Sequence, residues 1–336
     1  MSYAASRHID RSQIPIIDIS ALRGHAQGAV EAVAAQMLET ARRIGFFYVT
    51  GHGVPAATLV EANRRSREFF ARPLERKLEC KVNPYHRGFL RIGEAKMESA
   101  TRVDLKESWI WGLELAADDP ARDGHDPFLG HNQWPSDFPE FRAALVRLFG
   151  EMSSVAVDLM RAFAVSMSLP EDTFIRTARR PVSRGSSIYY PPQPPDMGAE
   201  QFGVSPHTDY GCLTLLWQDD VGGLEVRGAS GEWLTAHPVE GAFVVNVGDL
   251  LARWTNDGFR STPHRVVNRS GRERYSMALF WDPDGETVID PSVVCAADET
   301  PRYPPVTVAA HITERYQQSF AYRQPAPPGG ATDAGA

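Results

Sequence analysis

The chain has 336 residues, of which 43% are hydrophobic and 23% charged, a composition typical of folded globular proteins and unlike that of disordered chains. Its formal net charge is −7 and its Lys and Arg residues are scattered, so we expect no nucleic-acid partner. The first residues contain no apolar signal segment, no run approaches about 18 apolar residues, and the three cysteines are too dispersed for a disulfide framework, which together favour a cytoplasmic protein without a membrane span.

The first half of the chain mixes predicted strands and helices. Two compact apolar runs predict short strands, residues 14–19 and 45–49. Apolar side chains recur at three- and four-residue intervals in three segments that predict helices: residues 28–43, a stretch ending near Phe70, and residues 139–169. This half is therefore expected to be α/β in character.

The second half changes to β-rich runs separated by turn residues. The runs that predict strands are residues 188–190, 213–217, 224–226, 242–247, 265–267 and 275–281. Many short strands at this spacing indicate a sandwich or a barrel. No linker divides the two halves, so we do not expect independently folding domains. The Pro-, Gly- and Ala-rich tail from residue 324 lacks large apolar side chains and is expected to be disordered.

One candidate metal site centres on His207-Thr208-Asp209. Residues i and i+2 of a strand share a face, so the imidazole of His207 and the carboxylate of Asp209 could meet at one point. His264 could supply a third ligand, although His52, His131 and His237 compete for that role. Two histidines and one carboxylate leave coordination positions open, as in non-haem iron(II) oxygenases. A lone His-x-Asp is commonly a surface turn, so the prediction depends on its surroundings.

A candidate anion site follows at Arg274-Tyr275-Ser276. Arg274 and Ser276 would share a strand face, where a guanidinium fork and a hydroxyl suit the distal carboxylate of a dicarboxylic acid. An isolated Arg-x-Ser is ordinarily a surface arginine beside a small residue. The order and spacing of the His-x-Asp pair, His264 and this pair favour the functional interpretation.

Taken together, these motifs resemble the isopenicillin N synthase-like iron(II)/2-oxoglutarate dioxygenases over nearly the whole chain. The matching segments, in family order, are Ile14-Pro15-Ile16-Ile17-Asp18, residues 45–54, Tyr189-Tyr190-Pro191-Pro192, residues 207–211, Gly222-Gly223-Leu224, Asn246-Val247-Gly248-Asp249 and residues 261–265. One departure is Ile188, where several relatives have Asn. His52 falls in a structural turn of such proteins and is left out of the site.

The resemblance implies a mostly β fold with flanking helices and a double-stranded β-helix (jelly-roll) core. It divides the chain into an amino-terminal α/β region packed on the core (residues 1–120), a helical segment on the barrel (121–180), the oxygenase core (181–323) and the tail (324–336). It implies iron(II) on His207, Asp209 and His264, with 2-oxoglutarate and dioxygen as co-substrates. Arg274, Ser276 and Tyr190 would bind 2-oxoglutarate.

The activity implied is oxidation of a small organic substrate, by hydroxylation, desaturation or cyclisation, with release of succinate and CO2. The candidate substrate-pocket residues are Phe280, Asp282, Arg87, Phe89 and Trp111. Two alternatives remain: a related iron(II) oxidase that does not use 2-oxoglutarate, and a catalytically idle metabolite-binding protein on the same fold. The sequence contains no pattern that selects a prime substrate, an oxidised position, an oligomeric state or a pathway.

Overall fold

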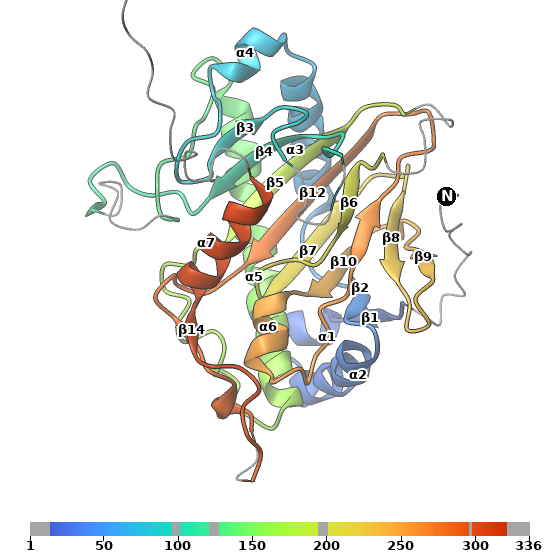
Figure 1. Cartoon of the computed structure of the whole chain (residues 1–336), viewed down its shortest axis with the longest axis vertical. Helices are drawn as coiled ribbons and strands as arrows, with labels where there is room; N and C mark the ends of the chain where they lie inside the picture. Colours follow the sequence, from blue (N-terminus) through green and yellow to red (C-terminus); the bar gives the residue numbers. More distant parts are fainter. Residues whose placement is uncertain are drawn as a thin grey trace, which may run out of the picture.

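The computed structural model describes residues 14–95, 100, 102–120, 128–193, 201–295 and 298–320. Within these ranges the strands form a large sheet in the order β1-β2-β10-β7-β12-β5-β4-β3, a smaller sheet in the order β6-β11-β8-β9, and the pair β13-β14 (Figure 1). The strands are β1 (Ile16–Asp18), β2 (Phe46–Thr50), β3 (Gly88–Leu90), β4 (Glu107–Gly112), β5 (Arg184–Tyr190), β6 (Val204–His207), β7 (Leu213–Gln218), β8 (Leu224–Arg227), β9 (Trp233–Thr235), β10 (Phe243–Val247), β11 (His264–Val266), β12 (Arg274–Trp281), β13 (Val288–Ile289) and β14 (Val306–Thr307).

The two larger sheets face each other across a buried apolar core. Phe46, Ile188 and Val244 of the large sheet pack in one cluster with Val204 and Leu224 of the smaller sheet. Because side chains alternate across a strand, each of these strands gives one set of side chains to the barrel interior. The predicted jelly-roll core is confirmed.

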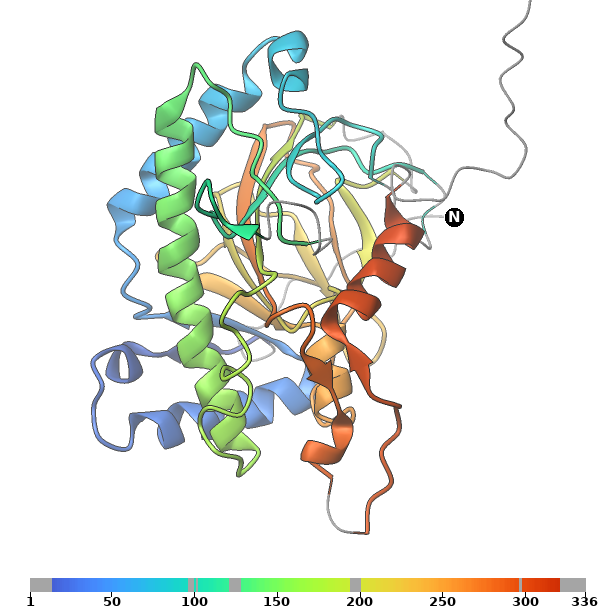
Figure 2. The same ribbon diagram turned by 90° about the vertical axis from the view of Figure 1, so that its left-hand side faces the viewer.

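Helices pack around the barrel. They are α1 (Ser20–Arg23), α2 (Ala29–Arg43), α3 (Ala56–Phe70), α4 (Leu74–Leu78), α5 (Pro139–Ser166), α6 (Asp249–Trp254) and α7 (Val308–Ser319), with a short 3-10 turn, η2 (Pro291–Val293). Helix α5 contacts α2, α3, β7 and β12. Figure 2 shows α5 and α3 on one side of the barrel and α7 on the other. A second buried apolar cluster fills the layer between these helices and the sheet.

The long helix α5 follows directly from its sequence. Proline at its first position needs no intrahelical donor, and the apolar side chains at three- and four-residue spacing, among them Phe141, Leu145 and Met152, are buried. The helix ends at Ser166 because Ser168 takes a left-handed conformation, with φ 58°, and the Leu169 amide bonds back to the Ala164 carbonyl. The observed end lies a few residues before the predicted one.

The amino-terminal third contributes strands to the large sheet. Strands β1 and β2 pair in parallel and β2 continues the sheet through β10, while β3 and β4 extend the other edge beside β5. Strands β3 and β4 and helix α7 were not predicted. Helix α7 nevertheless has a readable pattern, since its buried residues Val308, Ile312, Tyr316 and Ser319 are spaced by three or four.

The three cysteines are free thiols. No helix in the described part of the chain is both long and apolar enough to span a membrane. The expected disorder of residues 324–336 concerns residues that lie outside the described ranges, and the division of the chain near residues 120 and 180 stays a prediction.

Candidate active site

Three side chains converge inside the barrel at the end of β6. His207 is the last residue of β6 and lies opposite His264, the first residue of β11. Asp209 Oδ1 is 3.7 Å from the Nε2 atoms of both histidines. One ligand atom from each residue falls within 4.8 Å of the others. The predicted strand alternation is not what brings Asp209 here, because β6 ends at His207 and Asp209 reaches the cluster from the loop that follows.

Backbone carbonyls determine which ring nitrogen of each histidine carries a hydrogen. His207 Nδ1 lies 2.8 Å from the Ser205 carbonyl oxygen, and His264 Nδ1 lies 3.2 Å from that of Thr262. A carbonyl can only accept, so each Nδ1 carries the proton and each Nε2 presents a lone pair. Burial, with His264 close by, lowers the pKa of His207 well below its usual value. Each ring thus directs its Nε2 toward Asp209, an orientation common at metal-binding histidines.

The carboxylate of Asp209 is oriented in the same way. Its Oδ2 accepts hydrogen bonds from Thr214 Oγ1 at 2.7 Å and Asn246 Nδ2 at 2.8 Å, which leaves Oδ1 toward the histidines. Burial would by itself raise the pKa of Asp209, but the two histidines and the two hydrogen bonds together lower it. One carboxylate and two imidazole nitrogens on the same side of a metal position suit iron(II) and leave its other coordination positions open.

Arg274 is a buried cation whose hydrogen-bond partners are all neutral, although its guanidinium is close enough to the Asp219 carboxylate to offset part of the rise that burial causes in the pKa of Asp219. It is fully buried, and its Nε donates to the Gly222 carbonyl at 2.5 Å. Its Nη1 lies 3.4 Å from Ser276 Oγ, its Nη2 lies 3.3 Å from Gln218 Oε1, and the guanidinium lies over the Tyr190 ring, 4.6 Å from the centroid. No ion pair joins it to a carboxylate within the described residues. A buried charge in this setting suits an anionic ligand.

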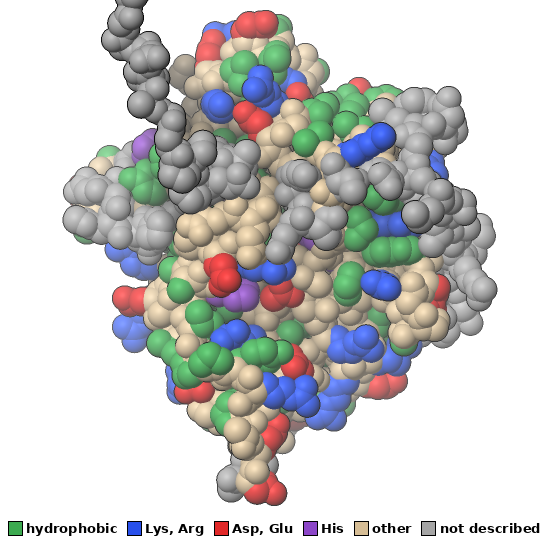
Figure 3. Space-filling model, viewed as in Figure 1, with side chains coloured by type: hydrophobic (Ala, Val, Ile, Leu, Met, Phe, Trp, Pro, Cys, Tyr) green, Lys and Arg blue, Asp and Glu red, His purple; other side chains and the backbone are tan. Residues whose placement is uncertain are grey.

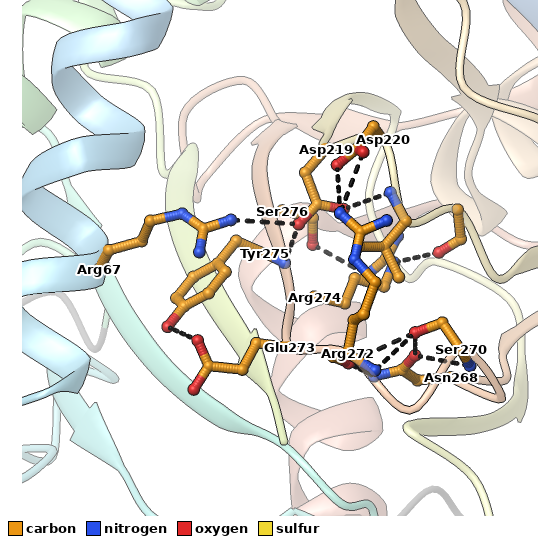
Figure 4. A network of polar contacts seen from close by, with 12 residues as sticks. Arg67, Asp219, Asp220, Asn268, Ser270, Arg272, Glu273, Arg274, Tyr275 and Ser276 are labelled. Atoms are coloured by element: carbon orange, nitrogen blue, oxygen red, sulfur yellow. Dashed lines mark hydrogen bonds and ion pairs between the residues drawn. The ribbon is translucent and has the colours of Figure 1, made fainter. Parts of the chain in front are cut away.

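The turn after β7 holds Arg274 in place (Figure 4). Asp219 accepts hydrogen bonds from the Tyr275 and Val221 amides, at 2.7 and 3.1 Å, and so ties the turn to β12. Burial is the main cause that raises the pKa of Asp219. The turn then presents the Gly222 carbonyl to Arg274. Glycine is required at the next position because Gly223 has φ +89° and a Cβ there would lie 2.6 Å from the Val267 carbonyl oxygen.

Two cavities meet at His207 and Asp209, two of the three converging side chains. We call inner the cavity that contains Arg274 and outer the one toward α7. The inner cavity is also lined by Phe46, Tyr190, Val204, Thr214, Leu216, Leu224, Asn246, His264, Val266, Ser276 and Ala278. The outer cavity is lined by His86, Leu90, Ala95, Ser108, Ile110, Arg184, Ser186, Thr208, Tyr210, Gly211, Tyr316 and Phe320. Both are lined by Lys106, Ile188, His207, Asp209 and Phe280.

Strand alternation explains much of this lining. On β12, Arg274, Ser276 and Phe280 share the inward face, and Phe280 is paired across the sheet with Arg184 of β5. Ile188, the departure from the family pattern, is paired with Ser276 and faces both cavities. Phe280 therefore lines both cavities together with His207 and Asp209.

The other four candidate pocket residues lie outside the linings of both cavities. Phe89 and Trp111 belong to the apolar cluster beneath the helices, because they occupy the outward face of their strands. Arg87 is buried and donates to the carbonyls of Tyr85, His86 and Phe128. Asp282 is fully buried and accepts from the Cys212 amide and Arg184. A structural role fits each of these positions.

The competing histidine His52 is also structural. Its Nδ1 accepts from the Val54 amide at 3.1 Å, its Nε2 lies 3.1 Å from the Gly241 carbonyl, and its ring stacks on Phe243. Several lining residues were missed by the sequence analysis, chiefly those of β4 and the carboxyl-terminal end of α7. The alternation in residues 106–111 and the spacing in α7 are the signals that could have found them.

The barrel, the two-histidine, one-carboxylate set and the buried arginine define a non-haem iron oxygenase. Comparison with known proteins agrees. Residues 186–283 match the family described as the 2OG-Fe(II) oxygenase superfamily, and residues 14–137 match the amino-terminal family described as non-haem dioxygenase in morphine synthesis.

Relatives cover almost the whole chain. The chain is 37% identical to the 2-oxoglutarate-Fe(II) type oxidoreductase hxnY of Emericella nidulans, over 91% of this chain and 90% of the relative. It is 33% identical to the homoarginine-6-hydroxylase 2-ODD-233 of Oryza sativa subsp. japonica, over 93% and 98%. Among solved structures, a full-length Neurospora crassa protein in complex with alpha-KG and thymine matches with a TM-score of 0.81 and 28% identity, covering 92% of this chain and 98% of that protein.

The chain belongs to the 2OG-Fe(II) oxygenase superfamily. It is an iron(II)- and 2-oxoglutarate-dependent oxygenase.

Proposed function

We propose that His207, Asp209 and His264 hold the iron and that Arg274 and Ser276 bind the distal carboxylate of 2-oxoglutarate. The observation that carries the second assignment is the buried Arg274 guanidinium on the wall of the inner cavity, which forms no ion pair among the described residues and whose hydrogen-bond partners are neutral. A carboxylate there would gain charge-assisted hydrogen bonds from the arginine fork. Tyr190, which lines the same cavity, offers its hydroxyl to the carboxylate nearer the metal.

The prime substrate is a small organic molecule with an apolar or aromatic body, bound in the outer cavity. The apolar side chains Leu90, Ile110, Phe280 and Phe320 in its lining support this proposal. Figure 3 shows basic and acidic side chains intermingled on one face of the molecule, without the basic block that a polyanion would need. The solved relatives include the Neurospora crassa protein with thymine and JOX2 with JA, both complexes with small molecules.

Iron, when bound, activates dioxygen and couples the decarboxylation of 2-oxoglutarate to oxidation of the substrate. The protein contributes binding, orientation and exclusion of side reactions. The two histidines and Asp209 leave one side of the metal position open toward both cavities. Arg274 and Ser276 would fix one end of the co-substrate, while Phe280, which lines both cavities, would set the distance between substrate and metal.

A screen of small molecules, read by oxygen uptake and succinate release, tests the proposed function. We expect succinate to form one for one with the oxidised product of a true substrate. Product without succinate would instead indicate an oxidase that does not use 2-oxoglutarate. Iron binding with no oxidised product across a broad set would indicate a binding protein.

A further inference from the structure

We infer that Lys106 binds an oxygen acceptor of the prime substrate, a carboxylate or a carbonyl group, next to the metal position. The inference rests on the proposed function, since it assigns the outer cavity to the substrate. It narrows the substrate class from a small apolar molecule to one that carries such an oxygen within reach of the reacting carbon.

Lys106 lies at the boundary between the two cavities. It lines both of them, together with His207 and Asp209, and its side chain is only 13% exposed. It directly precedes β4, where the inward positions Ser108 and Ile110 also line the outer cavity. Lys106 continues that alternation, so its ammonium group is directed into the barrel.

The ammonium group of Lys106 makes few polar interactions with the described residues. Its ion-pair partner is Asp104, at 3.6 Å from Nζ to Oδ2, which is too long for a good hydrogen bond. Asp104 is itself fully buried, and its Oδ1 is occupied by the Ser205 amide at 2.9 Å. An ammonium has three donors, and no hydrogen bond joins that of Lys106 to another residue in the described ranges. A largely buried ammonium group whose donors lack acceptors is suited to donate hydrogen bonds to an oxygen atom of a ligand.

The other cations of the two cavities are already engaged. Arg274 serves the inner cavity, where Ser276 lies beside it for the same carboxylate. Arg184 lines the outer cavity but is paired with the buried Asp282 at 3.1 Å. Among the described residues that line the outer cavity, Lys106 is thus the lysine or arginine that can turn to a substrate. This favours the substrate over 2-oxoglutarate as its ligand.

An anaerobic titration of the full chain, loaded with iron(II) and 2-oxoglutarate, tests the inference. Three probes of similar size are compared: benzoate, benzamide and toluene. Binding is followed by the change each causes in the visible absorption band of the iron(II)–2-oxoglutarate chelate. We expect benzoate and benzamide to bind the wild type more tightly than toluene, by about tenfold or more for benzoate.

Substitutions separate charge from hydrogen bonding. Lys106→Met should abolish the preference for both oxygen-bearing probes, Lys106→Gln should weaken benzoate more than benzamide, and Lys106→Arg should keep the preference. The matched control is Lys81→Met, because Lys81 is 55% exposed and lies outside both linings. It should bind all three probes as the wild type does.

The outcomes that overturn the inference differ from those that overturn the proposed function. Equal binding of the three probes by the wild type, no binding of any of them, or a preference unchanged in both Lys106→Met and Lys106→Gln would remove Lys106 from substrate recognition. Weaker binding of 2-oxoglutarate in these variants, with the probe preference intact, would assign Lys106 to the co-substrate instead. Absence of the absorption band from the wild type would contradict the proposed function itself.

Discussion

The inner and outer cavities share His207 and Asp209 but otherwise draw largely on different parts of the chain. The proposed iron and 2-oxoglutarate ligands that line the inner cavity all lie within residues 190–276: Tyr190, His207, Asp209, His264, Arg274 and Ser276. The outer cavity adds Leu90 and Ile110 from the first third of the chain and Tyr316 and Phe320 from its carboxyl-terminal part. Under the proposed function, this difference separates the groups that would bind iron and 2-oxoglutarate from those that would select a substrate.

This difference matches what relatives share and what they do not. The family match over residues 186–283 contains the three converging side chains and the arginine-serine pair. The relatives' names, in contrast, range from a homoarginine-6-hydroxylase to an azadirone synthase. We expect substitutions in the inner cavity to affect iron or 2-oxoglutarate, and those in the outer cavity to affect substrate use alone.

The largest effect is expected at the converging side chains. His207→Ala, Asp209→Ala and His264→Ala should each abolish iron-dependent turnover, because two remaining ligands neither retain nor orient the metal. The measurements are bound iron per chain and succinate formation, with circular dichroism to confirm folding. His131→Ala is the control, since that exposed histidine lies outside both linings. Near-normal activity at limiting iron in any of the three variants would remove that residue from the ligand set.

The candidate metal and anion residues that the sequence singled out all line the inner cavity, and the reason is physical. Iron ligands and a carboxylate-binding arginine must be particular residue types, so they leave a local pattern such as Arg274-Tyr275-Ser276. The outer cavity has no such requirement, and Tyr316 and Phe320 enter it only because α7 packs there. Phe89 and Trp111 were suggested by the family resemblance. Whether they face the cavity or the helices depends on the pairing register of β3 and β4, and the sequence alone does not reveal that register.

The second prediction concerns the hold on 2-oxoglutarate. Arg274→Lys keeps the charge but loses the two-pronged geometry, so we expect the KM for 2-oxoglutarate to rise. Loss of one charge-assisted hydrogen bond, worth about 1.5–3 kcal/mol, corresponds to a rise of about 10- to 150-fold. Initial rates of succinate formation at varied 2-oxoglutarate give the KM.

A matched control lies two residues earlier on the same hairpin. Arg272 is 60% exposed and pairs with Asp220 on the surface, so Arg272→Lys should leave the KM unchanged (Figure 4). An unchanged KM in Arg274→Lys would place the distal carboxylate elsewhere. It would also favour the alternative of an iron(II) oxidase that does not use 2-oxoglutarate.

The third prediction tests the boundary between the cavities. Phe280→Ala should uncouple the enzyme, since a substrate displaced by about 1 Å can react up to about 100-fold more slowly while 2-oxoglutarate is still consumed. The ratio of succinate to oxidised product should rise. Phe89→Leu is the control, because Phe89 lies in the core beneath the helices and should lower the melting temperature without changing that ratio. An unchanged ratio and substrate KM in Phe280→Ala would show that Phe280 acts in packing alone.

The smallest effect is expected at Tyr190, which lines the inner cavity and lies under the Arg274 guanidinium. Tyr190→Phe removes the hydroxyl and keeps the ring, so the loss of a single hydrogen bond of about 0.5–1.5 kcal/mol should raise the KM for 2-oxoglutarate about 2- to 12-fold. Tyr190→Leu also removes the ring and should raise it further, by the cation–π contribution to holding Arg274. Both KM values come from the assay used for Arg274→Lys. A change in the KM for the substrate, with the KM for 2-oxoglutarate unaltered, would instead show that Tyr190 acts in substrate binding. The assignment of the inner cavity to 2-oxoglutarate alone would then be wrong at this residue.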